Sequence, residues 1–373
     1  MIPVQRPYLG QEELLAVGKV FESRWLGMGT VTKEFEDRLR EFLGAKHVIA
    51  MSTGTAALHL AVAALDLREG DEVVVPSLTF VASVQAILAA GARPVFCEVS
   101  KETLTIDVSD VRRRMTAKTK AIMPVHYGGL ACDLDELLAF ARARKIWIVE
   151  DAAHAFGSSY KGRKIGTLGD LTCFSFDPIK NVSCGDGGAI ATDNDEFARR
   201  ILPSRNVGIG QDSWARQNTT RSWYYEVVAP GYRYHLGNLN AAIGLEQLKR
   251  FETFKARKQS IVRRYEEAFK NVSGLALPRR NLDETFPFFY VVRVLERRRE
   301  ALIEYLKERE IGTGVHYIPN HLQPLFAALR VSLPTTEQLF EEILTLPLYF
   351  EMTDADVETV IAAVRGFFGE GKE

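Results

Sequence analysis

The feature that most constrains this fold is a repeated alternation, in the first half of the chain, between short apolar runs and segments of helical character. The apolar runs occupy residues 47–51, 73–76, 94–97, 121–126 and 146–151. Runs of this length favour strands buried on both faces, and helices between them place such strands parallel in one sheet. The pattern therefore predicts an α/β fold with a parallel or mixed sheet between helices.

Small polar and charged residues follow these runs, where each predicted strand ends. They are Ser52, Thr53, Ser77, Thr79, His126, Asp151 and residues 175–180. The carboxyl ends of parallel strands share one edge of a sheet, and ligands of such sheets bind at that edge. We therefore expect a binding site where these residues converge.

Residues 52–60 begin a helix rich in alanine and leucine directly after the first predicted strand. Unpaired backbone N–H groups and the helix dipole at such a start attract anions, and the hydroxyls of Ser52 and Thr53 add donors. Serine and threonine are also the preferred caps of any helix, so this signal alone leaves both interpretations open.

Lys180 lies in the stretch 173–189, on a turn that follows a strand and Pro178. Its neighbours in sequence are apolar or glycine, with Asp177 as the nearest acid, so we expect its ammonium to be partly desolvated. Desolvation lowers the pKa of a lysine, as a lysine that bonds covalently to a carbonyl requires. The alternative is an ordinary surface lysine on a glycine-rich turn.

Asp151 closes an apolar strand and is followed by His154. A poorly solvated carboxylate needs a cationic partner. A metal site formed with His154, His126 and Asp133 is one alternative, although the spacing is not typical of metal ligands, and a helix cap is another. An aspartate for a pyridine nitrogen, a lysine and a helix start for a phosphate together meet the requirements of pyridoxal phosphate.

Composition excludes several classes of protein. The 373 residues carry a net charge of −1, which argues against nucleic-acid or anionic-membrane partners. Polar residues interrupt the uncharged stretch 73–92, so it is predicted to be strand, loop and helix and not a membrane span. The cysteines Cys97, Cys132, Cys173 and Cys184 form no C-x-x-C motif, and residues 1–11 do not resemble a signal peptide. Free thiols in a reducing, cytoplasmic compartment are expected.

With these motifs in order, the chain resembles the DegT family of sugar-nucleotide aminotransferases. The resemblance runs nearly end to end, through residues 6–7, 23–29, 52–60, 150–157, 174–181 and 314–317. It implies a fold-type I pyridoxal-phosphate enzyme, with a mostly parallel seven-stranded sheet between helices in a large domain and a smaller α+β C-terminal domain. No metal is implied.

The resemblance also implies roles for individual residues. Lys180 corresponds to the lysine that binds the cofactor covalently, Asp151 to the partner of the pyridine nitrogen, and His154 to a residue beside the ring hydroxyl. Phe80 corresponds to the aromatic residue that stacks on the ring, and Gly54, Thr55 and Ser175 to the phosphate-binding residues. Many relatives have an asparagine at the position of Arg233 that reaches the phosphate of a neighbouring subunit. We expect Arg233 or His235 to replace it in a homodimer with shared sites.

The activity implied is transfer of an amino group from L-glutamate to a keto sugar on a nucleotide diphosphate, in amino-sugar and polysaccharide biosynthesis. Residues 230–235 are similar to a subgroup that aminates a 4-keto sugar, and residues 316–321 to enzymes of 6-deoxy sugars, so a 4-keto, 6-deoxy hexose is expected. The expected sugar contacts are Trp25, Leu26, His316, Tyr317 and His321.

Other activities compete with this one. A 3-keto sugar aminotransferase and a non-catalytic regulator that binds the cofactor are the alternatives retained. A dehydratase branch has histidine at the position of Lys180, and a hydrolase would be built on Cys173 or Cys184 with His154.

We expect the large domain to occupy residues 1–244 and the small domain residues 245–373. In the small domain the pattern predicts one helix over 245–270, strands at 288–292 and 314–318, and a helix over 300–308. Residues 353–356 form a capping signature for the last helix.

Overall fold

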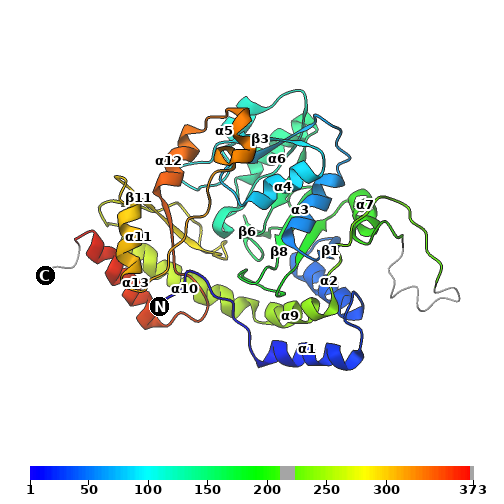
Figure 1. The fold of residues 1–373 in the computed structure, drawn as a ribbon, viewed down its shortest axis with the longest axis horizontal. Coiled ribbons are helices and arrows are strands. Elements are labelled where there is room, and N and C mark those ends of the chain that lie inside the picture. Colours follow the sequence, from blue (N-terminus) through cyan, green and yellow to red (C-terminus); the bar gives the residue numbers. More distant parts are fainter. Residues whose placement is uncertain (211–222, 370–373) are drawn as a thin grey trace.

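A computed structural model describes residues 1–210 and 223–369, and a seven-stranded sheet forms its centre (Figure 1). In spatial order its strands are β1 (His47–Met51), β9 (Gly188–Thr192), β8 (Leu171–Ser175), β5 (Trp147–Asp151), β4 (Thr119–Ile122), β2 (Glu72–Pro76) and β3 (Arg93–Cys97). Strand β9 runs antiparallel to both β1 and β8, whereas the other adjacent pairs are parallel. The predicted, mostly parallel sheet is confirmed.

One predicted strand is shorter in the structure. The pattern predicts a strand over residues 121–126, but β4 ends at Ile122. Pro124 has no N–H to donate to a neighbouring strand, and after it only an isolated bridge joins Val125 to Asp151. The chain therefore leaves the sheet beside the end of β5.

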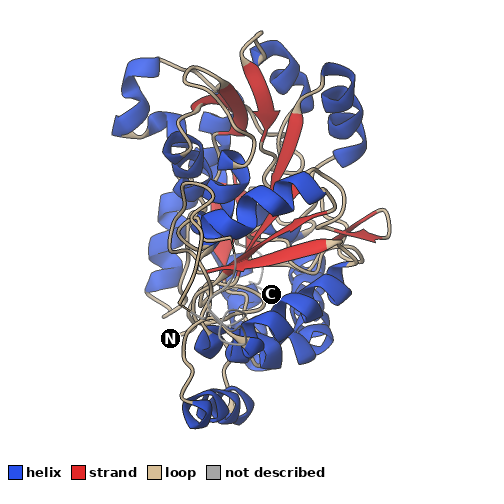
Figure 2. Ribbon diagram, turned by 90° about the vertical axis from the view of Figure 1, so that its right-hand side faces the viewer, coloured by secondary structure: helices blue, strands red, loops and turns tan. Residues whose placement is uncertain are grey.

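Helices cover both faces of the sheet, as Figures 1 and 2 show. Helices α3 (Gly54–Ala63), α4 (Val81–Ala89) and α7 (Asp195–Arg205) share one apolar core with one face. Helices α2 (Thr30–Leu43), α5 (Val108–Arg114) and α6 (Leu134–Arg144) share a second core with the other. Because both faces are covered, the strands carry continuous apolar runs.

The predicted helix over residues 245–270 is two helices. Arg250 separates α9 (Asn238–Lys249) from α10 (Phe251–Phe269) and caps both helices. α9 contacts α1 (Gln11–Ser23) and α2 in the large domain, whereas α10 packs against α13 (Asp354–Phe367) in the small domain. Residue 244 lies inside α9, so we propose the division between the domains at Arg250 and not at 244.

The small domain contains a second, antiparallel sheet of β10 (Leu275–Ala276), β11 (Tyr290–Val294) and β12 (Ile343–Leu346). It packs with α10, α11 (Arg299–Lys307) and α13 around one apolar core, and α12 (Pro334–Glu342) precedes β12. The capping signature is confirmed, because Thr353 and Asp356 exchange hydrogen bonds at the start of α13. The strand predicted at 314–318 is wrong: only a single bridge joins Gly314 to Thr345.

Short elements complete the chain. They are the hairpin β6 (Ser159–Tyr160) and β7 (Arg163–Lys164), and the 3-10 helices η1 (Tyr127–Gly129), η2 (Asn320–Leu322) and η3 (Pro324–Leu329). In the described part of the chain, no helix combines the length and apolar character needed to cross a lipid bilayer. The stretch 73–92 is strand, loop and helix, as expected.

Candidate active site

Asp151 is the last residue of β5, at the edge of the sheet where the parallel strands end. Its side chain is 4% exposed; Oδ2 accepts a hydrogen bond from Ser83 Oγ at 2.6 Å, and Oδ1 accepts one from the backbone N–H of Ala153 at 3.0 Å. Burial raises the pKa of Asp151, and these two hydrogen bonds oppose the rise because they stabilise the carboxylate. These two hydrogen bonds fix the carboxylate at a position where it can accept a hydrogen bond from a ligand.

Lys180 lies beyond β8 on a turn that we call the lysine turn, residues 177–181. Its backbone N–H bonds to the carbonyl of Asp177 at 3.0 Å, and its Nζ lies 4.2 Å from the centre of the Phe288 ring. Burial lowers the pKa of Lys180 to about 8, while Asp177 and Asp151 act in the opposite direction. The surroundings predicted from sequence are confirmed, and an aromatic ring from the C-terminal half of the chain completes them.

His154 lies between these two groups and two aromatic rings. Its imidazole stacks on Phe288 with 4.6 Å between ring centres, and Nε2 pairs with the hydroxyl of Tyr317 at 3.0 Å. Burial, then the nearby Lys180 and His316, lowers the pKa of His154 well below its usual range. Nδ1 is buried and has no hydrogen-bond partner within the described ranges. A buried polar atom of this kind indicates a partner that binds from outside the chain.

The turn between β1 and α3 forms a cradle at the same edge. Thr53 caps α3, its side chain accepting from Ala56 N–H, and the helix start at Gly54 and Thr55 lies beside Ser175. A Cβ at Gly54 would lie 2.8 Å from Ser175 Cβ, so only glycine allows β8 and α3 to approach this closely. The arrangement suits a phosphate, because the helix start offers N–H groups and Ser175 a hydroxyl.

Phe80 precedes α4 and is 54% exposed, with its ring 5.6 Å from that of Tyr317. The loop that carries it is fastened by η2: the Asn320 side chain donates to the carbonyls of Ser77 at 3.1 Å and Thr79 at 2.8 Å. An exposed aromatic ring at a binding edge fits stacking on a flat ligand.

His321 has a different role from the one predicted. Its Nδ1 pairs with Ser77 Oγ at 2.7 Å and its Nε2 with Glu337 at 3.2 Å, and the residue is buried. Both ring nitrogens are engaged, so His321 has no donor or acceptor left for a sugar. The predicted sugar contact is replaced by a structural link that supports the Phe80 loop.

His316 and Tyr317 do reach the site. His316 Nδ1 pairs with Thr345 Oγ1 at 2.8 Å, its ring stacks on Phe289, and its carbonyl accepts from the hydroxyl of Tyr127. Burial and then Lys180 lower the pKa of His316 to about 4, so the ring is neutral at neutral pH. These two residues lie beside the predicted cofactor contacts, as expected of groups on the sugar side.

Trp25, Leu26 and Arg233 are not brought to Lys180 within one chain. Trp25 Nε1 donates to Met28 carbonyl at 2.9 Å, and Leu26 carbonyl accepts from Asn238 N–H at 3.0 Å. Arg233 is exposed, and its segment lies along the cradle: Ser52 N–H donates to the Tyr234 carbonyl at 2.6 Å. The site that one chain presents therefore lacks these three predicted contacts.

The positions of the same residues argue against the metal site and the cysteine hydrolase that the sequence left open. His126 is fully buried against Glu150 at 2.8 Å, and Asp133 accepts from Tyr160; the described residues contain no cluster able to hold a metal. Cys173 and Cys184 are free but buried, and burial raises the pKa of both thiols, so neither is a nucleophile for a hydrolase.

Three contacts of the site were not predicted from the sequence. They are the hydroxyl of Ser83 on Asp151, the ring of Phe288 under Lys180, and the side chain of Asn181 in the lysine turn. Of these, Ser83 had a local signal. Thr79 and Ser83 are four residues apart at the start of a helix that follows a strand, a spacing that brings both hydroxyls to one face.

Comparison with known proteins identifies the family of this chain. The model of the DegT/DnrJ/EryC1/StrS aminotransferase family matches residues 7–365. The spore coat polysaccharide biosynthesis protein SpsC of Bacillus subtilis is 40% identical over 98% of this chain and 96% of its own length. The crystal structure of the aminotransferase TlmJ from Streptoalloteichus hindustanus superposes with a TM-score of 0.92 at 38% identity, covering 99% of each chain. The PLP-form of Spr1654 from Streptococcus pneumoniae, assigned as a sugar aminotransferase, superposes with a TM-score of 0.91 at 29% identity over 99% of each chain.

Proposed function

Since this chain belongs to the DegT/DnrJ/EryC1/StrS aminotransferase family and is a sugar aminotransferase that uses pyridoxal phosphate, we propose that it moves the amino group of L-glutamate to a nucleotide-linked keto sugar. The proposed acceptor is a 4-keto, 6-deoxy hexose on a nucleotide diphosphate. The observation that carries the transaminase chemistry is that Lys180, on the turn after β8, lies near enough to Asp151, at the end of β5, for each charge to act on the pKa of the other.

The residues present fit pyridoxal phosphate. The cradle at Gly54, Thr55 and Ser175 suits the phosphate. A Cβ at residue 54 would occupy the space between the helix start and Ser175. Asp151 is a buried acceptor for a ring N–H, and the unpartnered His154 Nδ1 suits a hydroxyl on the same ring. When bound, the cofactor supplies an electron sink for the pair of electrons left when a carbon beside the amine loses its proton.

Lys180 is the group that moves protons. Its Nζ takes a proton from the carbon that bears the donor amine, and in the second half-reaction it gives a proton to the sugar carbon that becomes aminated. A pKa of about 8 leaves a useful fraction of the side chain as free amine near neutral pH, and the protonated form is a moderately strong acid. Asp151 meanwhile holds the proton on the ring nitrogen, and the rings of Phe288 and Tyr317 restrict water.

The sugar side is formed by His316 and Tyr317, next to the exposed ring of Phe80. The Tyr317 hydroxyl is engaged with His154, and the neutral imidazole of His316 offers no charge to the acceptor. The choice of a 4-keto sugar is supported by the likeness of residues 230–235 to the enzymes of that subgroup. A 3-keto acceptor remains the competing proposal.

The test uses the purified protein loaded with pyridoxal phosphate and L-[¹⁵N]glutamate. Thymidine- and uridine-diphosphate 4-keto-6-deoxyglucose and their 3-keto isomers are offered separately, and products are identified by mass spectrometry. We expect the ¹⁵N label in an amino sugar from a 4-keto compound. Preferential labelling of a 3-keto isomer would select the competing acceptor, and a protein that fails to convert glutamate to its keto acid would contradict glutamate as the donor. The parent 4-hydroxy sugar is the unreactive control.

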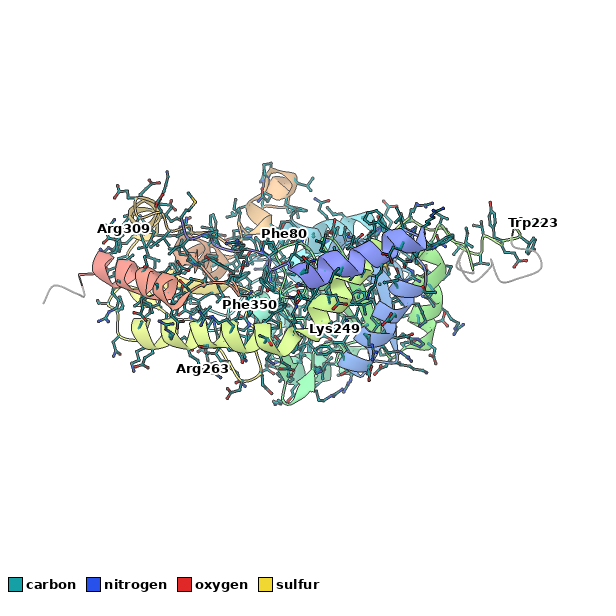
Figure 3. The ribbon with its side chains drawn as sticks, turned by 90° about the horizontal axis from the view of Figure 1, so that it is seen from below. Phe80, Trp223, Lys249, Arg263, Arg309 and Phe350 are labelled. Atoms are coloured by element: carbon teal, nitrogen blue, oxygen red, sulfur yellow. The ribbon has the colours of Figure 1, made fainter. Side chains whose placement is uncertain are left out.

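We propose in addition that two copies of the chain pair and complete each other's sites, with Arg233 contacting the partner's cofactor phosphate. Two apolar surfaces support this. Trp223 is 74% exposed and lies at the end of the molecule opposite Arg309 (Figure 3), with Tyr225 and Val227 exposed beside it. Leu14, Leu15 and Phe21 are exposed on α1. Patches of this kind mark interfaces.

A subunit-mixing experiment checks the pairing. We expect Arg233→Ala to weaken cofactor binding by about tenfold or more, the usual cost of a lost hydrogen bond to a charged group. At a cofactor concentration that loads the wild type but not Arg233→Ala, mixed and re-equilibrated Lys180→Ala and Arg233→Ala chains should recover about a quarter of the wild-type sites, because half the pairs are mixed and each holds one intact site. A mixture as inactive as its components, or a monomer in sedimentation equilibrium, would contradict shared sites.

A further inference from the structure

Lys258 is a buried lysine without a carboxylate partner. It lies in the middle of α10, and the residue is 7% exposed. Its Nζ donates to Asn181 Oδ1 at 2.8 Å and to the carbonyl of Phe288 at 3.3 Å, both uncharged acceptors. In residues 1–210 and 223–369 it forms no ion pair. A buried ammonium with only neutral partners is costly to keep, so its presence calls for an explanation beyond packing.

Both acceptors of Lys258 are direct neighbours of Lys180. Asn181 follows Lys180 in the lysine turn, and its side-chain nitrogen donates to the carbonyl of Phe286 at 3.2 Å. Phe288 lies on the same segment and places its ring 4.2 Å from Lys180 Nζ. One side chain therefore joins the lysine turn to the segment before β11 that covers it.

The two lysines also differ in pKa. Burial and then the charge of Lys180 lower the pKa of Lys258 to about 7. Asp177 and Asp151 act on Lys180 in the opposite direction. Because its pKa is the lower of the two, Lys258 is mostly uncharged at the pH where Lys180 titrates, so it acts on Lys180 through hydrogen bonds and not through charge.

We propose that Lys258 is a positioning residue for Lys180: its Nζ donates to Asn181 and to the carbonyl of Phe288, and so holds the lysine turn against the segment that keeps Lys180 poorly solvated. This inference rests on the proposed role of Lys180 as the proton-moving group. The competing explanation is that Lys258 only fills space between α10 and the turn, in which case an apolar side chain of similar length would serve equally well.

The test measures the amine of Lys180 directly, in full-length protein freed of cofactor. The rate at which Lys180 reacts with acetic anhydride is followed from pH 6 to 11 by peptide mass spectrometry, in the wild type, Lys258→Met and Lys258→Arg. Lys255→Met is the matched control, because Lys255 lies on the same helix, donates only to the carbonyl of Gly157 in the described structure and is partly exposed.

We expect Lys258→Met to raise the pKa of Lys180 by about one unit, a tenfold loss of free amine near neutral pH, because the turn loses both hydrogen bonds and water reaches Lys180, whose pKa is lowered by burial. Lys258→Arg keeps donors for both acceptors and should stay within about half a unit of the wild type. In the loaded enzyme, Lys258→Met should lower kcat for the glutamate half-reaction about tenfold or more and leave KM for the keto sugar within about twofold.

An unchanged pKa of Lys180 in Lys258→Met, or an equal shift in Lys255→Met, would overturn the proposal. Equal losses of kcat in Lys258→Met and Lys258→Arg at constant Lys180 pKa would assign Lys258 to packing alone. If Lys258→Met does not fold, Asn181→Ala replaces it, since it removes the same hydrogen bond from the side of the lysine turn. Labelling requires neither glutamate nor a sugar, so its result is independent of whether the proposed acceptor is correct.

Discussion

Replacing Lys180 by alanine is expected to abolish transamination while leaving the fold intact. The loss should be at least about 10³-fold in kcat, because a positioned acid–base group alone contributes roughly 10²–10⁴-fold and the covalent attachment is lost as well. Lys180 is half-buried and donates only its backbone N–H within the lysine turn, so removing its side chain leaves no buried carboxylate of the turn without a partner. Single-turnover absorbance with glutamate measures the loss.

Lys161→Ala is the matched control for this variant. Lys161 is exposed and pairs with Asp135 on the surface, an interaction of little energetic value. It should retain wild-type activity. A Lys180→Ala protein that converts glutamate within tenfold of the wild-type rate, while the cofactor remains bound through a covalent bond, would show that another amine performs the chemistry.

Replacing Asp151 by asparagine is expected to lower kcat by about 10²–10³-fold, the usual range for removing a preorganised electrostatic partner in a site. Asparagine keeps the size of the side chain: its oxygen can accept from the Ala153 N–H, and its NH2 can donate to Ser83 Oγ, whose hydroxyl can turn to the Phe80 carbonyl, so the geometry at the end of β5 should be preserved. What is lost is the negative charge that holds a proton on the ring nitrogen. The ultraviolet and visible spectrum of the loaded variant should report a ring nitrogen that no longer stays protonated.

The dependence of activity on pH tests the role of Asp151 in a second way. Burial raises the pKa of Asp151, so in the wild type the carboxylate is lost as the pH falls through that raised value, and activity should fall on the acid side. An asparagine side chain does not titrate, so we expect the acid limb assigned to this group to disappear in Asp151→Asn. Persistence of the same acid limb in the variant would assign it to another group.

Asp170→Asn separates this effect from a general sensitivity of buried aspartates. Asp170 is also partly buried, with its pKa raised by burial, but it accepts from Ile148 N–H near the start of β5, away from the site. Its replacement should change stability by about 1–3 kcal/mol at most and leave the pH profile of kcat unaltered.

The sheet and its ligand-binding edge could be predicted because their signals are local. An apolar run of strand length, a small polar turn and a helix start recur from β1 to β5, and each set needs only a few neighbouring residues. Asp151 and Lys180 follow from the same logic, since each closes or follows such a run. The edge where parallel strands end then brings them together without knowledge of any long-range contact.

The incorrect predictions concern segments whose structure is determined by long-range contacts. The apolar stripe of residues 245–270 continues across Arg250, and nothing local marks the break, yet the side chain of Arg250 turns toward Glu12 and Glu13 of α1. Residues 314–318 have strand composition, but β12 is already paired with β11 and offers them a single bridge at Thr345. Tertiary packing overrides propensity in both cases.

The site residues that were missed or misjudged share the same cause. Lys258 and Asn181 are separated by 77 positions, and Ser77 and His321 by 244, so their hydrogen bonds leave no pattern in either local sequence. His321 lies in a motif that resembles sugar-binding enzymes, but its hydrogen bonds point inward to Ser77 and Glu337. A motif identifies the segment, and only the packing shows which side chains face the ligand.

The fastening of the Phe80 loop by η2 has a consequence for biosynthesis. Thr79 and Asn320 are 241 positions apart, and ribosomes add about 5–20 residues per second, so roughly 10–50 s separate the synthesis of the two. In the later part of that interval, once Lys180 has been made, the nascent chain has the residues of the cradle and the lysine but lacks the η2 support of the stacking ring. We therefore expect the complete cofactor site to form only after nearly the whole chain has been synthesised.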